Sequence, residues 1–188
     1  MSGSTAPAIA TPDAVLRFWF EETRPAQWWS RSDAFDALIA ERFAATHAAA
    51  ARGECAGWRA TPEGRLAEVI VLDQFSRNLH RDSPLAFACD AAALALAQEA
   101  VARGDDEKLP VARRAFLYLP YMHSESLAVH DEVAVLFARP GLEDNLRSER
   151  QHRAILERFG RYPHRNAVLG RESTADEIAF LGTAGSSF

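Results

Sequence analysis

Apolar residues recur at helical spacing along nearly the whole chain, and no stretch alternates apolar and polar residues as a strand does. Leu66, Val69 and Ile70 lie three and four residues apart, and Phe35 and Ile39 begin a second such stripe. Helices that each bury one apolar stripe must pack against one another. The pattern therefore predicts an all-α fold of about eight helices.

Capping residues mark where these helices begin and end. A Ser or Thr followed by proline is a start signal, because proline fits the first turn and the hydroxyl caps it. Thr174 and Glu177 have the spacing of a capping box, and we expect Pro120 to break its helix. The predicted helices cover roughly 13–20, 32–51, 61–77, 83–102, 110–119, 124–139, 142–159 and the segment from 174 onward.

The length of 188 residues fits one domain, and no low-complexity linker divides the chain. We expect a disordered lead-in over residues 1–11 and a single helical domain over 12–188. The lead-in lacks the basic start of a secretory signal, and no apolar run reaches the roughly 18 residues of a membrane span. Cys55 and Cys89 fit free thiols in a reducing compartment, so the expected location is the cytoplasm.

The net charge of −5 argues against binding to nucleic acid. Lys108 is the only lysine among 21 basic residues, and the rest are arginine. Guanidinium groups bind carboxylates and phosphates through two parallel hydrogen bonds. A GC-rich coding genome produces the same bias, so composition alone does not assign a function.

Asp73 continues the stripe of Leu66, Val69 and Ile70, so this carboxylate is expected to face inward. Arg77 lies four residues further on and can pair with it. Burying a charge costs several kcal/mol unless the charge is paired. The segment is therefore either an ion pair that clamps helix ends or one wall of a polar pocket.

His123 follows Pro120 in a second polar segment, where the proline break is expected to place it at a helix entrance. Unpaired backbone N–H groups at such an entrance attract anions. His123 could act as an acid or base near neutral pH, with Glu125 orienting it. Simple capping by Ser124 and Glu125 explains the same residues without any function.

A third polar segment, residues 161–166, follows Gly160 and is stiffened by Pro163. It is too short and too polar to be an idle linker. No HExxH, Walker-type, GxGxxG or GxSxG element is present, so the familiar metalloprotease, nucleotide-binding and serine-hydrolase motifs are missing. His152 lies on the apolar stripe of its helix and is expected to be a core histidine.

The polar segments together resemble one family, the bacterial domain-of-unknown-function family numbered 924. The resemblance covers about residues 14–181, with Ser76 standing where the family usually has proline. It implies membership of the tetratricopeptide-like superfamily and hence antiparallel helix pairs stacked in a right-handed array. It implies no activity. The motifs that carry the resemblance are VLRFWF (15–20), LDQF (72–75) with Arg77-Asn78, FLYLPYMHSE (116–125), FGRYPHRN (159–166) and LGR (169–171).

The leading functional hypothesis is a binding module with a polar Arg/His/Asp pocket for a small anionic ligand or a peptide carboxylate. An alternative is a hydrolase-type enzyme that uses His123 with Asp73 or Glu125 as acid and base. The other alternative is a purely structural polar network. No cofactor, metal or membrane partner is expected. The residues assigned to ligand binding are Gln74, Arg77, Asn78, Ser124, Arg161, His164, Arg165 and Asn166.

Overall fold

Helices make up the folded part of the chain, which a computed structural model describes from residue 8 to residue 186. No strand occurs in that range, so the predicted all-α fold is confirmed. The right-handed array and the single domain over 12–188 stay predictions. The α-helices are α1 (Pro12–Arg17), α2 (Pro25–Trp28), α3 (Asp33–Ala51), α4 (Pro62–Ile70), α5 (Ser76–Leu79), α6 (Asp90–Ala102), α7 (Val111–Met122), α8 (Leu127–Phe137), α9 (Glu143–Phe159) and α10 (Ala175–Leu181).

Shorter helical turns join these α-helices. The expected lead-in over residues 1–11 falls mostly on 1–7, outside the described residues; Ala10 donates its backbone N–H to Thr46 Oγ1 at 2.8 Å. The 3₁₀ turns are η2 (Ala56–Ala60), η4 (Pro84–Phe87), η5 (Asp106–Lys108) and η6 (Pro163–Arg165), and the π-helical turns are η1 (Phe18–Glu22) and η3 (Val71–Phe75).

Most of the predicted caps are found where the sequence places them, Ser124 being the exception. The hydroxyls of Thr11, Ser32 and Thr61 each accept a backbone N–H of the first turn that follows. The capping box between Thr174 and Glu177 is also present. These local signals explain why most helix starts could be predicted within a residue or two.

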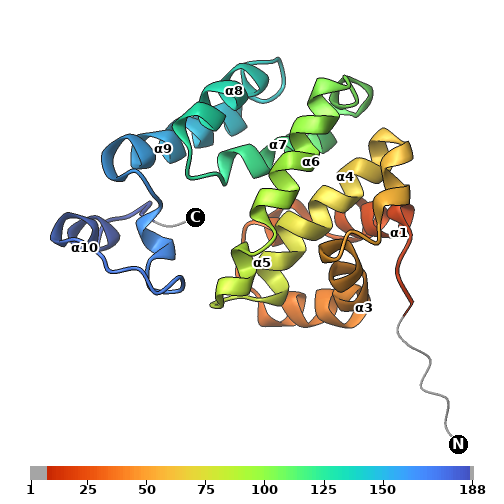
Figure 1. The fold of residues 1–188 in the computed structure, drawn as a ribbon, viewed down its shortest axis with the longest axis horizontal. Coiled ribbons are helices and arrows are strands. Elements are labelled where there is room, and N and C mark those ends of the chain that lie inside the picture. Colours follow the sequence, from red (N-terminus) through yellow and green to blue (C-terminus); the bar gives the residue numbers. More distant parts are fainter. Residues whose placement is uncertain (1–7, 187–188) are drawn as a thin grey trace, which may run out of the picture.

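The main core is built from buried side chains of α1, α3, α4, α6, α7 and α8. Figure 1 shows α4 and α6 between the N-terminal helices and α8. Leu66, Val69 and Ile70 of α4 are fully buried, as their spacing predicted. A second, smaller apolar cluster joins the end of α9 to α10. The C-terminal elements, drawn in blue, thus have their own apolar centre at one side of the molecule (Figure 1).

The helix that starts at Pro62 does not break at Ser76, the position where proline was the expected family residue. It passes from α4 through the π-helical turn η3 into α5 and ends at Leu79. Ser76 supports this continuity, because its hydroxyl donates to the carbonyl of Leu72 at 2.5 Å. A π-helical turn holds one extra residue and often occurs at functional sites. Asp73 lies in the middle of η3.

The expected break at Pro120 is wrong, because Pro120 lies inside α7. The helix continues to Met122 although proline removes one hydrogen bond, since Leu117, Tyr118 and Tyr121 around it are buried in the core. His123 is consequently the C-cap of α7 and not a helix entrance. The dipole there favours positive charge, so the anion-binding argument from backbone N–H groups fails at His123.

Ser124 is not a helix cap either. The next helix, α8, begins at Leu127 after Ser126 as its N-cap residue. The carbonyl of Ser124 instead accepts a hydrogen bond from His130 Nε2 at 3.0 Å. Residues 123–126 therefore form a short link between two helix ends.

One stretch of the described residues, Pro84–Ala102, is long and apolar enough for a membrane span by length and composition alone. The chain turns between η4 and α6, which leaves α6 with 13 residues where a span needs about 20. Ala93, Ala97 and Ala100 of α6 are fully buried against the core. The helix α6 therefore packs against the core along this alanine face.

Candidate functional site

Asp73 is the best-held carboxylate of the polar segments and is only 1% exposed. Gln74 Nε2 donates to its Oδ2 at 2.6 Å, and Arg77 lies 3.1 Å from its Oδ1. Burial alone would raise the pKa of Asp73, but the charge of Arg77 and the hydrogen bonds from His123 and Gln74 hold it well below its usual range. Asp73 is therefore an ionised carboxylate at neutral pH, as the predicted pairing with Arg77 requires.

His123 meets Asp73 across 50 residues of sequence. Its Nδ1 lies 2.7 Å from Asp73 Oδ1, and its side chain is 14% exposed. Burial and the neighbouring charge of Arg77 lower the pKa of His123, so the imidazole is neutral at pH 7. An ionised carboxylate only accepts hydrogen bonds, so the proton lies on Nδ1 and the lone pair lies on Nε2. This is the protonation state of a general base.

Asp90, at the start of α6, links two of the predicted arginines. Its carboxylate lies 3.1 Å from Arg77 and 3.3 Å from Arg165. Arg165 also donates to the carbonyl of His123 at 2.9 Å, which ties the third polar segment to the second. Both guanidinium groups lie over the ring of Phe87, at 5.7 and 4.6 Å from its centroid.

The charges of this cluster cancel. Asp73 and Asp90 supply two negative charges, and Arg77 and Arg165 supply two positive ones, while His123 is neutral. A strong general attraction for anions, as the leading sequence hypothesis assumed, is not built into the cluster. The cluster does offer a neutral imidazole beside a partly exposed guanidinium group. The side chain of that residue, Arg77, is 22% exposed.

Glu125 is committed to another partner, so it does not orient His123. Its carboxylate binds Arg171 through two hydrogen bonds of 2.7 and 2.9 Å and also accepts the backbone N–H of Tyr162. Of the two carboxylates predicted as orienting groups, Asp73 is the one in contact with the imidazole. Glu125 joins residues 123–126 to the third polar segment instead.

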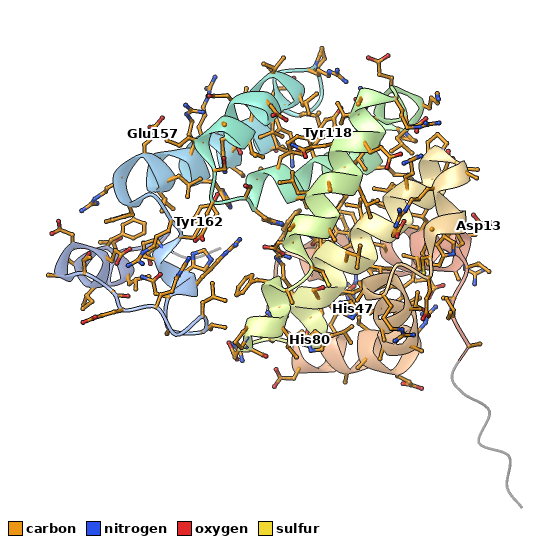
Figure 2. The ribbon with its side chains drawn as sticks, viewed as in Figure 1. Asp13, His47, His80, Tyr118, Glu157 and Tyr162 are labelled. Carbon is orange, nitrogen blue, oxygen red and sulfur yellow. The ribbon has the colours of Figure 1, made fainter. Side chains whose placement is uncertain are left out.

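A buried histidine network that the sequence analysis did not identify lies directly behind this link. His130 Nδ1 lies 2.5 Å from Glu149 Oε1, and both side chains are at most 1% exposed. Tyr162 donates its hydroxyl to the carbonyl of Met122 at 2.6 Å and lies 3.1 Å from His130 Nε2. Figure 2 shows Tyr162 just past the end of α9, where the chain turns toward α10. The Tyr162–Met122 hydrogen bond ties this network to the end of α7, just before residues 123–126.

The remaining predicted ligand-binding residues lie around the cluster without joining it. Gln74 holds Asp73 as described, and the other residues bind partners elsewhere. Asn78 donates to Asp36, Arg161 binds Glu177 and the carbonyl of Glu172, Asn166 donates to Ser173, and the ring of His164 lies against Tyr162. The structure therefore brings together Asp73, Gln74, Arg77, His123 and Arg165, but not Arg161 or Asn78.

Asp90, Phe87 and Arg171 are the parts of the site that the sequence analysis did not assign. Arg171 belongs to a motif of the family resemblance, so a signal existed for it. Asp90 sits at the start of an alanine-rich helix, where an acidic residue is explained by the helix dipole alone. Phe87 carries no sign of its role in the sequence.

Two open surface pockets are lined by residues outside the cluster. One, of about 340 Å³, lies beside α1 and Arg113, and the other, of about 420 Å³, lies between Arg158 and the start of α10. Within residues 8–186, no group of three or more His, Cys, Asp or Glu side chains is placed to hold a metal ion. His47 and His80, labelled together in Figure 2, are a pair of rings 5.3 Å apart.

This all-α chain, with its three polar segments joined through Asp73, His123 and Arg165, matches the model of a bacterial family of proteins of unknown function. The chain belongs to this family, DUF924, which matches residues 15–185. A solved structure of a protein of unknown function from Agrobacterium tumefaciens is similar, with 38% identity and a TM-score of 0.86. The similarity covers 91% of this chain and 96% of that one. No curated protein matches the chain.

Proposed function

We propose that the protein is an acid–base enzyme of the hydrolase type, with His123 as the general base. The observation that carries the proposal is the 2.7 Å contact between His123 Nδ1 and a buried, ionised Asp73. This contact fixes the tautomer and turns Nε2 into the basic atom. Asp73 acts as the positioning residue, and Gln74 and Arg77 hold its carboxylate in place.

The substrate is a small molecule with an anionic or strongly hydrogen-bonding group. Arg77 is the partly exposed guanidinium in contact with the pair, and the buried guanidinium of Arg165 lies behind it on Asp90. The Nε of Arg165 is buried and makes no hydrogen bond to any described residue, so donor capacity remains beside His123. A neutral cluster of this kind favours a polar, shape-matched ligand over non-specific anions.

A hydrolysis assay with a His123→Gln variant tests the proposal. The panel consists of p-nitrophenyl acetate, butyrate and phosphate, followed by release of nitrophenolate. We expect His123→Gln to lower kcat/KM about 10²- to 10⁴-fold, because that is the usual contribution of a general base. The wild-type rate should fall only at a pH well below the ordinary histidine pKa of 6.5, because burial and Arg77 lower the pKa of His123 and protonation of Nε2 removes the base.

His80→Gln is the matched control, because His80 is a half-buried histidine outside the cluster. Its kcat/KM should stay within about twofold of wild type. Thermal unfolding of both variants confirms that each one is folded. Turnover that is unchanged in His123→Gln, or a wild-type rate no higher than buffer for every panel member, contradicts the proposal.

A binding module without turnover is the second candidate. The Nε–H of Arg165, which makes no hydrogen bond to a described residue, favours it. Titration calorimetry with acetate and with inorganic phosphate tests it directly. Binding of either anion that is weakened about tenfold by Arg77→Gln, with no turnover in the ester assay, would support this reading over the enzyme. A purely structural network predicts neither binding nor turnover.

A further inference from the structure

The third polar segment is bounded by two glycines with left-handed backbone conformations. Gly160 has φ +69° and Gly170 has φ +65°, and no atom lies within 4 Å of where a Cβ would stand at either position. Backbone rotations at such open, side-chain-free positions meet little steric resistance. Residues 161–169, which we call the strap, therefore lie between two positions suited to act as hinges.

Polar side chains attach the strap to the rest of the molecule along residues 122–125. Arg165 donates to the carbonyl of His123 and approaches Asp90, while the backbone N–H of Tyr162 donates to Glu125. Just beyond the strap, Arg171 binds Glu125 through two hydrogen bonds and donates a third to the carbonyl of Tyr162 in the strap, so it joins the strap to Glu125. Each of these attachments therefore involves His123 itself or its neighbours in the cluster and the link, Asp90 and Glu125.

The apolar contacts of this region stay mostly within the C-terminal part. Tyr162 belongs to the small cluster with Ile155 and Leu156 of α9, and Phe180 of α10 packs against the same cluster. The main core does not include any residue of the strap. Lifting the strap thus breaks its charged contacts and the hydrogen bonds that Tyr162 makes to Met122 and Glu125, but it leaves the main core packed and costs less than unfolding.

We propose that the strap is a hinged cover that opens between Gly160 and Gly170 to admit a ligand to His123, and that Arg165 and Arg171 latch it shut. Arg165 is the main latch, because its side chain is 7% exposed and it lies between the rings of Phe87 and Tyr162 at 4.6 and 4.9 Å. The inference rests on the proposed function only in naming His123 as the reacting group. Its test does not use turnover.

Chemical modification of histidine by diethyl pyrocarbonate tests the strap. The reagent acylates neutral imidazoles, and peptide mass spectrometry gives a separate rate for each histidine. In an Arg165→Gln variant we expect the rate at His123 to rise about tenfold, because a charge-assisted hydrogen bond to a buried group is lost and the open state gains population. The rate at His47, buried on α3, should stay at its wild-type value.

Arg161→Gln is the matched control in the same strap. Arg161 binds Glu177 and the carbonyl of Glu172, which are both in the C-terminal part, so its loss should leave His123 within about twofold of wild type. An equal rise at His123 in both variants would indicate general loosening and overturn the proposal. No rise in Arg165→Gln would overturn it as well.

Arg171→Gln keeps the test decisive where Arg165→Gln fails to fold. The Arg171–Glu125 pair is about one quarter exposed on each side, so its loss should be tolerated. We expect a rise at His123 of about threefold with His47 unchanged. Parallel rises at His47 and His123 mean global unfolding and contradict a hinged cover. If modification of His123 rises in Arg165→Gln while the protein hydrolyses no ester, the hinged cover is supported and only the proposed enzyme is rejected.

Discussion

Replacing Trp19 with alanine should lower the free energy of unfolding by about 3–5 kcal/mol, the usual cost of removing a large buried aromatic side chain. Trp19 is 1% exposed and lies in the π-helical turn η1. Its ring lies 5.6 to 6.2 Å from the rings of Trp28, Phe35, Phe75 and Phe116. Alanine leaves a cavity that this rigid aromatic cluster cannot collapse to fill.

Urea unfolding measured by far-UV circular dichroism gives the free energies, and Trp19→Phe is the control. The indole Nε1 of Trp19 is buried without a hydrogen-bond partner among the described residues. Phenylalanine keeps most ring contacts and removes that unpaired donor, so its cost should be only about 1–2 kcal/mol. Equal costs for the two variants would show that the indole N–H does have a partner and that our account of the cluster is wrong.

The helices were predictable because their signals are local. The caps at Ser32, Thr61 and Thr174 and the apolar stripe of α4 each act within a few residues, and each one was found in place. The error at Pro120 shows where local reasoning stops. Proline disfavours a helix interior by about 3 kcal/mol, and the buried residues of α7 around it supply more than that.

The site could be predicted only in part, because its central contacts join distant segments. The pairing of Asp73 with Arg77 followed from a four-residue spacing. The contact of Asp73 with His123 spans 50 residues, and the extra residue of η3 changes the direction of the side chains that follow. No spacing rule gives either fact. Asp90 could not be found at all, since its partners come from two other segments.

The error at Pro120 also changes the functional hypothesis. A histidine at a helix entrance would sit among unpaired N–H groups and favour anions, whereas His123 ends α7 and sits at the negative end of its dipole. The dipole at that end favours a protonated imidazole, yet burial and Arg77 outweigh it and keep His123 neutral. The position and neutral state of His123 are therefore the reason that we favour acid–base chemistry over anion binding.

Replacing Asp73 with asparagine should lower the free energy of unfolding at pH 7 by about 3 kcal/mol. The substitution leaves the partly buried Arg77 with one carboxylate fewer, and it places an amide N–H against Gln74 Nε2, which is also a donor. Removing one partner of a buried pair costs about 3–5 kcal/mol. We expect the lower end, because Arg77 keeps Asp90 and some contact with water.

The pH dependence of stability separates Asp73 from the histidines. The folded-state pKa of Asp73 lies below its ordinary value of 3.8, so its contribution is complete above pH 4 and is lost as the pH falls below that value. His123, His47 and His152 have lowered pKa values, so the stability that they affect begins to fall as the pH drops below 6.5. Asp73→Asn should therefore flatten the loss below pH 4 and keep the loss between pH 6.5 and 4.

Asp36→Asn is the control for this measurement, because the Asp36–Arg81 pair is more exposed, at 14% and 28%. Its loss should cost at most about 1 kcal/mol at pH 7. Urea unfolding at a series of pH values gives both results. If Asp73→Asn costs no more than Asp36→Asn, the carboxylate is not the buried anchor of His123, and the base assigned to Nε2 loses its support. A cost of the expected size combined with full turnover would keep the anchor and reject the catalytic role.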